Sequence, residues 1–126
     1  MWTLQWQDNE PHEVLSVEQL NHALDQVAGS HDETNPVLVQ LRSPSGEVLM
    51  IGIGGALSVL DYIAAGGWPA QHSVGSATDE TISYMMGTYD SEMPKAYAIP
   101  YPTARRAVEQ FFERGTLSSE VQWEAD

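Results

Sequence analysis

The stretch VLVQLRSPSGEVLMIGI, residues 37–53, decides the fold because it predicts two strands joined by a tight turn. Val37, Val39 and Leu41 alternate with other residues, which is the period of a strand with one buried face. The segment SPSG, residues 43–46, is typical of a turn, since serine, proline and glycine favour turn geometries. Residues 48–53 then return as a second apolar run. We therefore expect a β-hairpin over residues 37–53.

Further strands are predicted on both sides of this hairpin. Residues 2–6 alternate tryptophan and leucine with polar residues, and the segment DNEP, residues 8–11, breaks that strand. Residues 57–63 fit a strand or a helix by pattern, but their valine, tyrosine and isoleucine favour a strand. The remaining expectations are strands at 71–75, 81–86 and 121–123, a short extended run at 96–99, and an acidic loop at 89–93.

Two amphipathic helices complete the prediction. In the first helix Ser16 is the expected N-cap, Gln19 completes a capping box, and Leu15 and Leu20 form a hydrophobic staple. Gly29 is the expected end of this helix. Its apolar face repeats at the helical spacing through Leu20, Ala23, Leu24, Val27 and Ala28.

The prolines of PYP, residues 100–102, predict an extended entry and suit the first turn of the second helix, which stops at Gly115. Arg105 and Arg106 are expected to pair weakly with glutamates of the same helix, namely Glu109 and Glu113. Its apolar face comprises Ala104, Ala107, Val108, Phe111 and Phe112. We expect Trp2, Trp6, Trp123, Phe111 and Phe112 to be core residues. The fold class is therefore α+β: a mostly antiparallel sheet with two amphipathic helices in a single domain, residues 1–126.

The charge of the chain restricts its partners. Eighteen acidic residues against five basic ones give a formal net charge of −13. Such a surface repels phosphate backbones and anionic lipid, so direct nucleic-acid and membrane binding are disfavoured. A basic protein partner, or solubility alone, remains as the reason for this charge.

Cysteine is absent from the sequence, which excludes disulfides, thiolate metal sites and cysteine nucleophiles. The N-terminal residues lack the basic and apolar regions of a signal peptide. The longest nearly apolar run, residues 48–60, is too short to span a bilayer. We therefore expect a cytoplasmic protein.

No motif in the sequence predicts catalysis, a cofactor or a metal. The segment GIGG, residues 52–55, lacks both the third glycine of a dinucleotide loop and a neighbouring lysine. His22 has Glu18 and Asp25 at helical spacing, but no third ligand is implied. His72 and Ser73 are adjacent on a strand and point to opposite faces, so they do not form a triad. A small hydrolase would need a convergent pocket that the sequence does not suggest.

Aromatic and acidic residues in the expected turns and loops are the candidates for binding a protein partner. Large aromatic side chains serve as interface anchors, and carboxylates complement a basic surface. Two alternatives stay open: Trp68 folds back onto the core, and Tyr84 lies within the sheet. The candidate residues are Trp68, Asp79, Glu80, Tyr84, Tyr89, Asp90 and Glu92.

An ordered set of short segments resembles the first-numbered immunity-protein family of bacterial polymorphic toxin systems. The resemblance covers roughly residues 36–124, and the usual proline-containing turn after the last helix is here GTLSS, residues 115–119. The segments are LMIGIG (49–54), LSVLDY (57–62), SVG (73–75), EMP (92–94), IP (99–100), ARRA (104–107), FFERG (111–115) and VQW (121–123).

The resemblance implies a non-enzymatic inhibitor that binds a secreted or contact-delivered toxin and protects the producing cell. Members often accompany nucleic-acid deaminase toxins, and others accompany nucleases, so an acidic inhibitor is expected to occupy a basic substrate groove. The alternative is an acidic ligand-binding or structural adaptor with no toxin partner.

Overall fold

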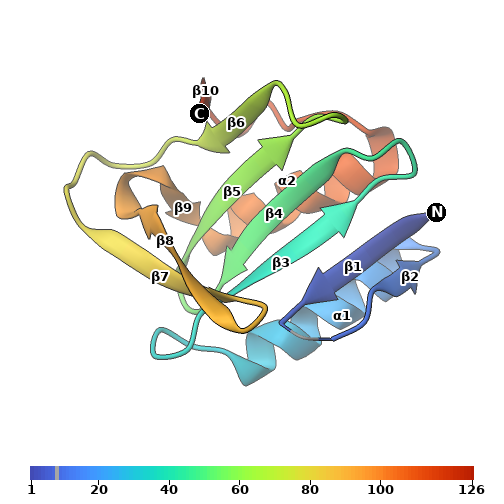
Figure 1. Ribbon diagram of the computed structural model, residues 1–126, viewed down its shortest axis with the longest axis horizontal. Coiled ribbons are helices and arrows are strands. Elements are labelled where there is room, and N and C mark those ends of the chain that lie inside the picture. The colour runs from blue at the N-terminus through green and yellow to red at the C-terminus, as the bar shows by residue number, and fades with distance from the viewer. Residues whose placement is uncertain (8) are drawn as a thin grey trace.

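A computed structural model describes residues 1–7 and 9–126, and its dominant feature is a mostly antiparallel sheet with both helices on one face (Figure 1). Asp8, part of the predicted break after the first strand, lies outside the described residues. In spatial order the main sheet contains β10 (Trp123–Ala125), β6 (Ala70–Ser73), β5 (Leu57–Ile63), β4 (Val48–Ile53), β3 (Val37–Arg42), β1 (Trp2–Trp6) and β2 (His12–Val14).

The predicted hairpin is confirmed at the centre of this sheet. Strands β3 and β4 pair antiparallel from Val37 opposite Ile53 to Arg42 opposite Val48. All six residues of β4 are buried, because apolar side chains cover both faces of the strand: Leu49, Ile51 and Ile53 belong to one cluster, and Val48 and Met50 to another. The α+β class with a mostly antiparallel sheet and two helices is likewise confirmed.

The first helix, α1 (Val17–Ser30), begins as its capping residues predict. The Ser16 hydroxyl accepts a hydrogen bond from the Gln19 amide at 3.2 Å, and the Gln19 side chain accepts one from the Leu15 amide at 2.9 Å. The hydrophobic staple is wrong, because Leu15 is 71% exposed. The helix also continues one residue beyond Gly29.

The second helix, α2 (Tyr101–Arg114), ends as predicted at Gly115, which has a φ of 70°. The predicted pairs of Arg105 and Arg106 with glutamates of the same helix are wrong. Arg105 instead reaches across to α1, and its Nη2 donates 2.9 Å hydrogen bonds to the carbonyl of Asn21 and a carboxylate oxygen of Asp25. Tertiary partners thus replace the local ones.

Two apolar clusters lie on the two faces of the sheet. The larger cluster fills the space between the sheet and the helices, and there Trp2 meets Phe111 edge-on with ring centroids 5.2 Å apart. Phe111 is fully buried, whereas the other predicted core aromatics pack against the cluster while half-buried: Trp2, Trp6, Phe112 and Trp123. The smaller cluster lies on the opposite face, under a second hairpin.

That second hairpin consists of β7 (Thr81–Met86) and β8 (Tyr89–Pro94), so the expectation of an acidic loop at 89–93 is wrong. Its polar residues gave no strand pattern, and pairing with β7 makes the strand. The sequence also missed β2, which pairs with β1. The extended run expected at 96–99 is divided into a 3-10 turn, η1 (Lys95–Tyr97), and β9 (Ala98–Pro100).

Candidate functional site

The β7–β8 hairpin lies on the face of the sheet opposite the helices (Figure 1). Its inner face contributes Ile82, Tyr84 and Met93 to the smaller apolar cluster. Cross-strand partners in an antiparallel pair share a face, and side chains alternate along each strand. Asp90 and Glu92, opposite Met85 and Ser83, therefore lie together on the outer face of the hairpin, where both are exposed.

Tyr84, one of the candidate partner-binding residues, is not on this outer face. Its side chain is 1% exposed and packs against Gly52 of β4, because the glycine leaves room for the ring. Burial raises the pKa of Tyr84 to about 12. Of the two readings the sequence left open for Tyr84, the structure supports a position within the sheet, where it cannot touch a partner.

The two exposed aromatic candidates lie at opposite ends of the sheet. Tyr89, 62% exposed, is at the tip of the hairpin, near the start of β3, where Val37 pairs with Met85. Trp68, 71% exposed, lies in the turn after β5, whose last residue, Ile63, is opposite Val48 at the start of β4. Trp68 does not fold back onto the core, and it does not share a surface with Tyr89.

Asp79 and Glu80 precede β7 and are both exposed. A Glu80 carboxylate oxygen lies 3.4 Å from the Lys95 ammonium, an exposed pair that contributes little stability. This pair borders a hollow of about 440 Å³ whose walls include Glu33, Leu57 and Ile82. The base of the hairpin therefore combines carboxylates with apolar surface.

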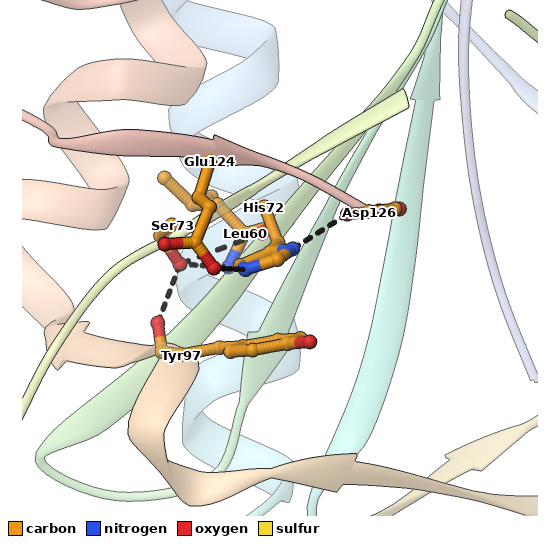
Figure 2. A network of polar contacts seen from close by, with 6 residues as sticks. All are labelled: Leu60, His72, Ser73, Tyr97, Glu124 and Asp126. Atoms are coloured by element: carbon orange, nitrogen blue, oxygen red, sulfur yellow. Dashed lines mark hydrogen bonds and ion pairs between the residues drawn. The ribbon is translucent and has the colours of Figure 1, made fainter. Parts of the chain in front are cut away.

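A buried polar network, of which only His72 and Ser73 were considered from the sequence, lies where β5, β6 and the C-terminal residues meet (Figure 2). His72 is 2% exposed and its ring stacks on Tyr97 with centroids 3.5 Å apart. Its Nδ1 lies 2.6 Å from an Asp126 carboxylate oxygen, and its Nε2 lies 3.4 Å from one of Glu124. The signal available in the sequence was Asp61 in a mostly apolar strand, followed by a histidine in the next strand.

Asp61 is opposite His72 on the neighbouring strand. Burial and the nearby Asp126 carboxyl raise the pKa of Asp61 to about 7. Its Oδ1 is buried without a hydrogen-bond partner among the described residues. The network therefore fastens the C-terminal residues to β6 at the cost of a poorly solvated carboxyl group.

This network is not arranged as a hydrolase triad. The Ser73 hydroxyl donates to the Tyr97 carbonyl at 2.6 Å and accepts from the Leu60 amide at 2.9 Å. These backbone bonds occupy the hydroxyl, so Ser73 is held as a structural residue. No group of three or more metal-binding side chains occurs among residues 1–7 and 9–126.

None of the helices in the described part of the chain has the length and apolar character needed to cross a membrane. The described residues thus form a small acidic α+β protein that exposes many carboxylates and two large aromatic side chains, Trp68 and Tyr89. The family model of immunity protein Imm1 matches residues 8–125, so the chain belongs to the Imm1 immunity protein family.

This membership confirms the resemblance seen in the sequence and the non-enzymatic class. The protein is an immunity protein of a polymorphic toxin system and binds a cognate toxin, which removes the alternative of an adaptor without a toxin partner. No curated protein matches the chain significantly.

Proposed function

We propose that this immunity protein neutralises a nucleic-acid-targeting toxin, a deaminase or a nuclease, by covering its basic substrate groove with an acidic surface. The observation that carries the proposal is the outer face of the β7–β8 hairpin. There Asp90 and Glu92 are exposed on one face, and neither forms an ion pair with another described residue.

Neighbouring residues add an aromatic side chain and further carboxylates around this face. Tyr89, opposite Met86, lies on the inner side of the hairpin at its tip, where its ring is still exposed enough to contact a partner. Asp79 and the Lys95-paired Glu80 add carboxylates at the base of the hairpin. Tyr84 acts from beneath by holding the hairpin on the sheet. Trp68 lies at the far end of the sheet, so we assign it no part in this surface.

Charge complementarity between the two proteins would accelerate their encounter. An enzyme that acts on DNA or RNA needs a basic groove to hold the phosphates. A protein of net charge −13 is attracted to that groove over distances comparable to the Debye length. We expect the encounter in the cytoplasm, where the nucleic-acid substrate lies.

The test is charge reversal on the hairpin, with inhibition of the purified cognate toxin as the measurement. Asp90→Lys combined with Glu92→Lys should weaken inhibition by about tenfold or more. The matched control is Glu13→Lys combined with Glu113→Lys, which changes the net charge equally at exposed sites on β2 and α2. Equal inhibition by both double variants would contradict the proposed surface.

A further inference from the structure

Strand β8 has one unpaired edge. It pairs with β7 alone among the strands that the structure describes, and it spans six residues. The two ends of the main sheet, β2 and β10, span only three residues each. The far edge of β7 is also six residues long, but it is partly taken by β3, which pairs with it at Met85. In the described part of the chain, β8 is therefore the longest strand with an edge that no other strand pairs with.

One hydrogen bond establishes which backbone groups of β8 face that open side. The Met85 amide of β7 donates to the Pro36 carbonyl at 2.8 Å, so it points toward β3 and away from β8. In an antiparallel ladder, a residue whose backbone groups point away from the partner strand belongs to a non-hydrogen-bonded pair. Met85 is paired with Asp90, so the backbone groups of Asp90 also point away from β7.

The direction of the backbone groups alternates along the strand. Asp90 and Glu92 therefore each present an amide and a carbonyl at the open edge, whereas Ser91 and Met93 direct theirs toward β7. The backbone of Pro94, two residues after Glu92, also faces the open edge. Proline has no amide hydrogen, so it loses no hydrogen bond there, which is why proline is tolerated on edge strands. The two residues with outward carboxylates are the same two with free backbone groups.

We propose that a β-strand of the toxin adds to the open edge of β8, with lysine or arginine side chains beside Asp90 and Glu92. This inference rests on the proposed function and specifies how the hairpin binds. Strand addition gains affinity from main-chain hydrogen bonds and specificity from side chains at alternate positions. Opposite charges on neighbouring strands add to the stability of the pairing.

The charges select this occupant over a second copy of the chain. If two β8 strands paired with each other, the carboxylates of Asp90 and Glu92 in one copy would approach those of the other. Like charges directly across a strand pair are destabilising, and charged residues on edge strands protect sheets from self-association. A basic strand turns the same charges into an attraction.

Hydrogen exchange resolved by residue tests the proposal directly. In the free protein the amides of Asp90 and Glu92 should exchange fast, while those of Ser91 and Met93 should be protected by β7. On adding the purified catalytic domain of the cognate toxin, exchange at Asp90 and Glu92 should slow by at least about tenfold. Unchanged exchange at both amides in an inhibited complex would overturn strand addition.

Two variants of Glu92 separate the contribution of its backbone amide to toxin binding from that of its carboxylate. Glu92→Gln removes the carboxylate and keeps the amide, whereas Glu92→Pro removes both at a position whose amide does not serve β7. Glu92→Pro should weaken inhibition by about a further tenfold relative to Glu92→Gln. Protection of the Ser91 and Met93 amides in each variant verifies that the hairpin persists, and equal inhibition by the two variants would overturn the proposal.

These outcomes also distinguish the inference from the proposed function. If charge reversal abolishes inhibition but the two amides stay unprotected, the acidic surface stands and strand addition fails. If the amides become protected but charge reversal has no effect, the occupant is not a basic strand and the proposed function fails with it. A dimer of the isolated protein with both amides protected would instead identify a second copy as the occupant.

Discussion

The ring of Tyr84 lies against the backbone of Gly52, so the β7–β8 hairpin rests on the central strand at that strand's only glycine. A Cβ atom added to Gly52 would lie 2.7 Å from the Tyr84 hydroxyl oxygen and closer still to the ring carbons. The contact between Tyr84 and Gly52, on the inner face of the hairpin, therefore holds the proposed binding surface in place.

We first predict that Gly52→Ala lowers the free energy of unfolding by about 1–3 kcal/mol, because it overpacks this contact. Urea denaturation measures the change. Gly29→Ala is the control, since an added Cβ there meets nothing within 4 Å. Combining Gly52→Ala with Tyr84→Leu should cost less than the sum of the two single changes, and strict additivity would contradict the overlap.

The raised pKa of Asp61 predicts a pH-dependent stability. Between about pH 4 and pH 7 the folded state retains a proton that the unfolded state has released, so stability falls as the pH rises through this window. Asp61→Asn removes the penalty and should gain about 1–2 kcal/mol at pH 8, a figure reduced for partial exposure of the group.

Urea denaturation at pH 4 and pH 8 compares Asp61→Asn with the unmodified protein. The two should converge at the lower pH, where the Asp61 carboxyl is protonated in the folded state. Asp79→Asn, at an exposed position, changes the net charge equally and serves as the control. A constant difference between Asp61→Asn and the unmodified protein at both pH values would contradict the assignment.

The separation of the exposed aromatics predicts different effects on toxin inhibition. Tyr89→Ala should weaken inhibition by about 1–2 kcal/mol, whereas Trp68→Ala should leave it unchanged, because Trp68 lies at the far end of the sheet. Titration of toxin activity measures both variants. An effect of Trp68→Ala as large as that of Tyr89→Ala would move the interface away from the hairpin.

Arg105 joins the two helices through a guanidinium fork that lysine cannot reproduce. It donates hydrogen bonds to Asn21 and Asp25 on α1 and to the Tyr101 hydroxyl on its own helix. Arg105→Lys should cost about 1–2 kcal/mol of stability in thermal or urea unfolding.

The matched control for this change is Arg106→Lys. Arg106 pairs with Glu120 at 3.1 Å with both side chains 53% exposed, so its replacement should cost less than about 0.5 kcal/mol. If the two substitutions had equal effects, the bridge from Arg105 to α1 would contribute nothing beyond an exposed ion pair.

Salt should slow binding if the acidic surface guides the encounter. The association rate with the toxin should fall steeply as the ionic strength rises, because the Debye length shortens. Stopped-flow or surface-binding kinetics at several salt concentrations measure the slope. The Asp90→Lys, Glu92→Lys variant should show a shallower slope than the unmodified protein, and parallel slopes would place the steering charges elsewhere.

Much of the architecture follows from local sequence. Apolar residues alternate in residues 37–53 and recur at helical spacing in the two helices. These patterns indicate which side of each element is buried, so the hairpin and both helices could be predicted. β8 could not be predicted in this way. Its polar residues carry little strand preference, and its pairing with β7 supplies the backbone hydrogen bonds that make it a strand.

The sequence supplied the residue types of the candidate site, but not how those residues are arranged in space. Asp90 and Glu92 were recognised as exposed acids, yet only the strand pairing puts them on one outer face. Tyr84 looked like an anchor because its type is common in interfaces, and only its contact with Gly52 shows it buried. Contacts between residues distant in the chain leave no local pattern.

The sequence by itself determined the acidity, the α+β class, the two helices with their ends near Gly29 and at Gly115, and the family of the protein. Each of these depends on composition, on periodicity or on an ordered set of neighbouring residues. Only the tertiary structure decided which acids share a surface, which aromatic is buried and which backbone groups of β8 are free. Those properties arise from strand pairing and packing across the chain, where the partner of each residue is set by the whole fold.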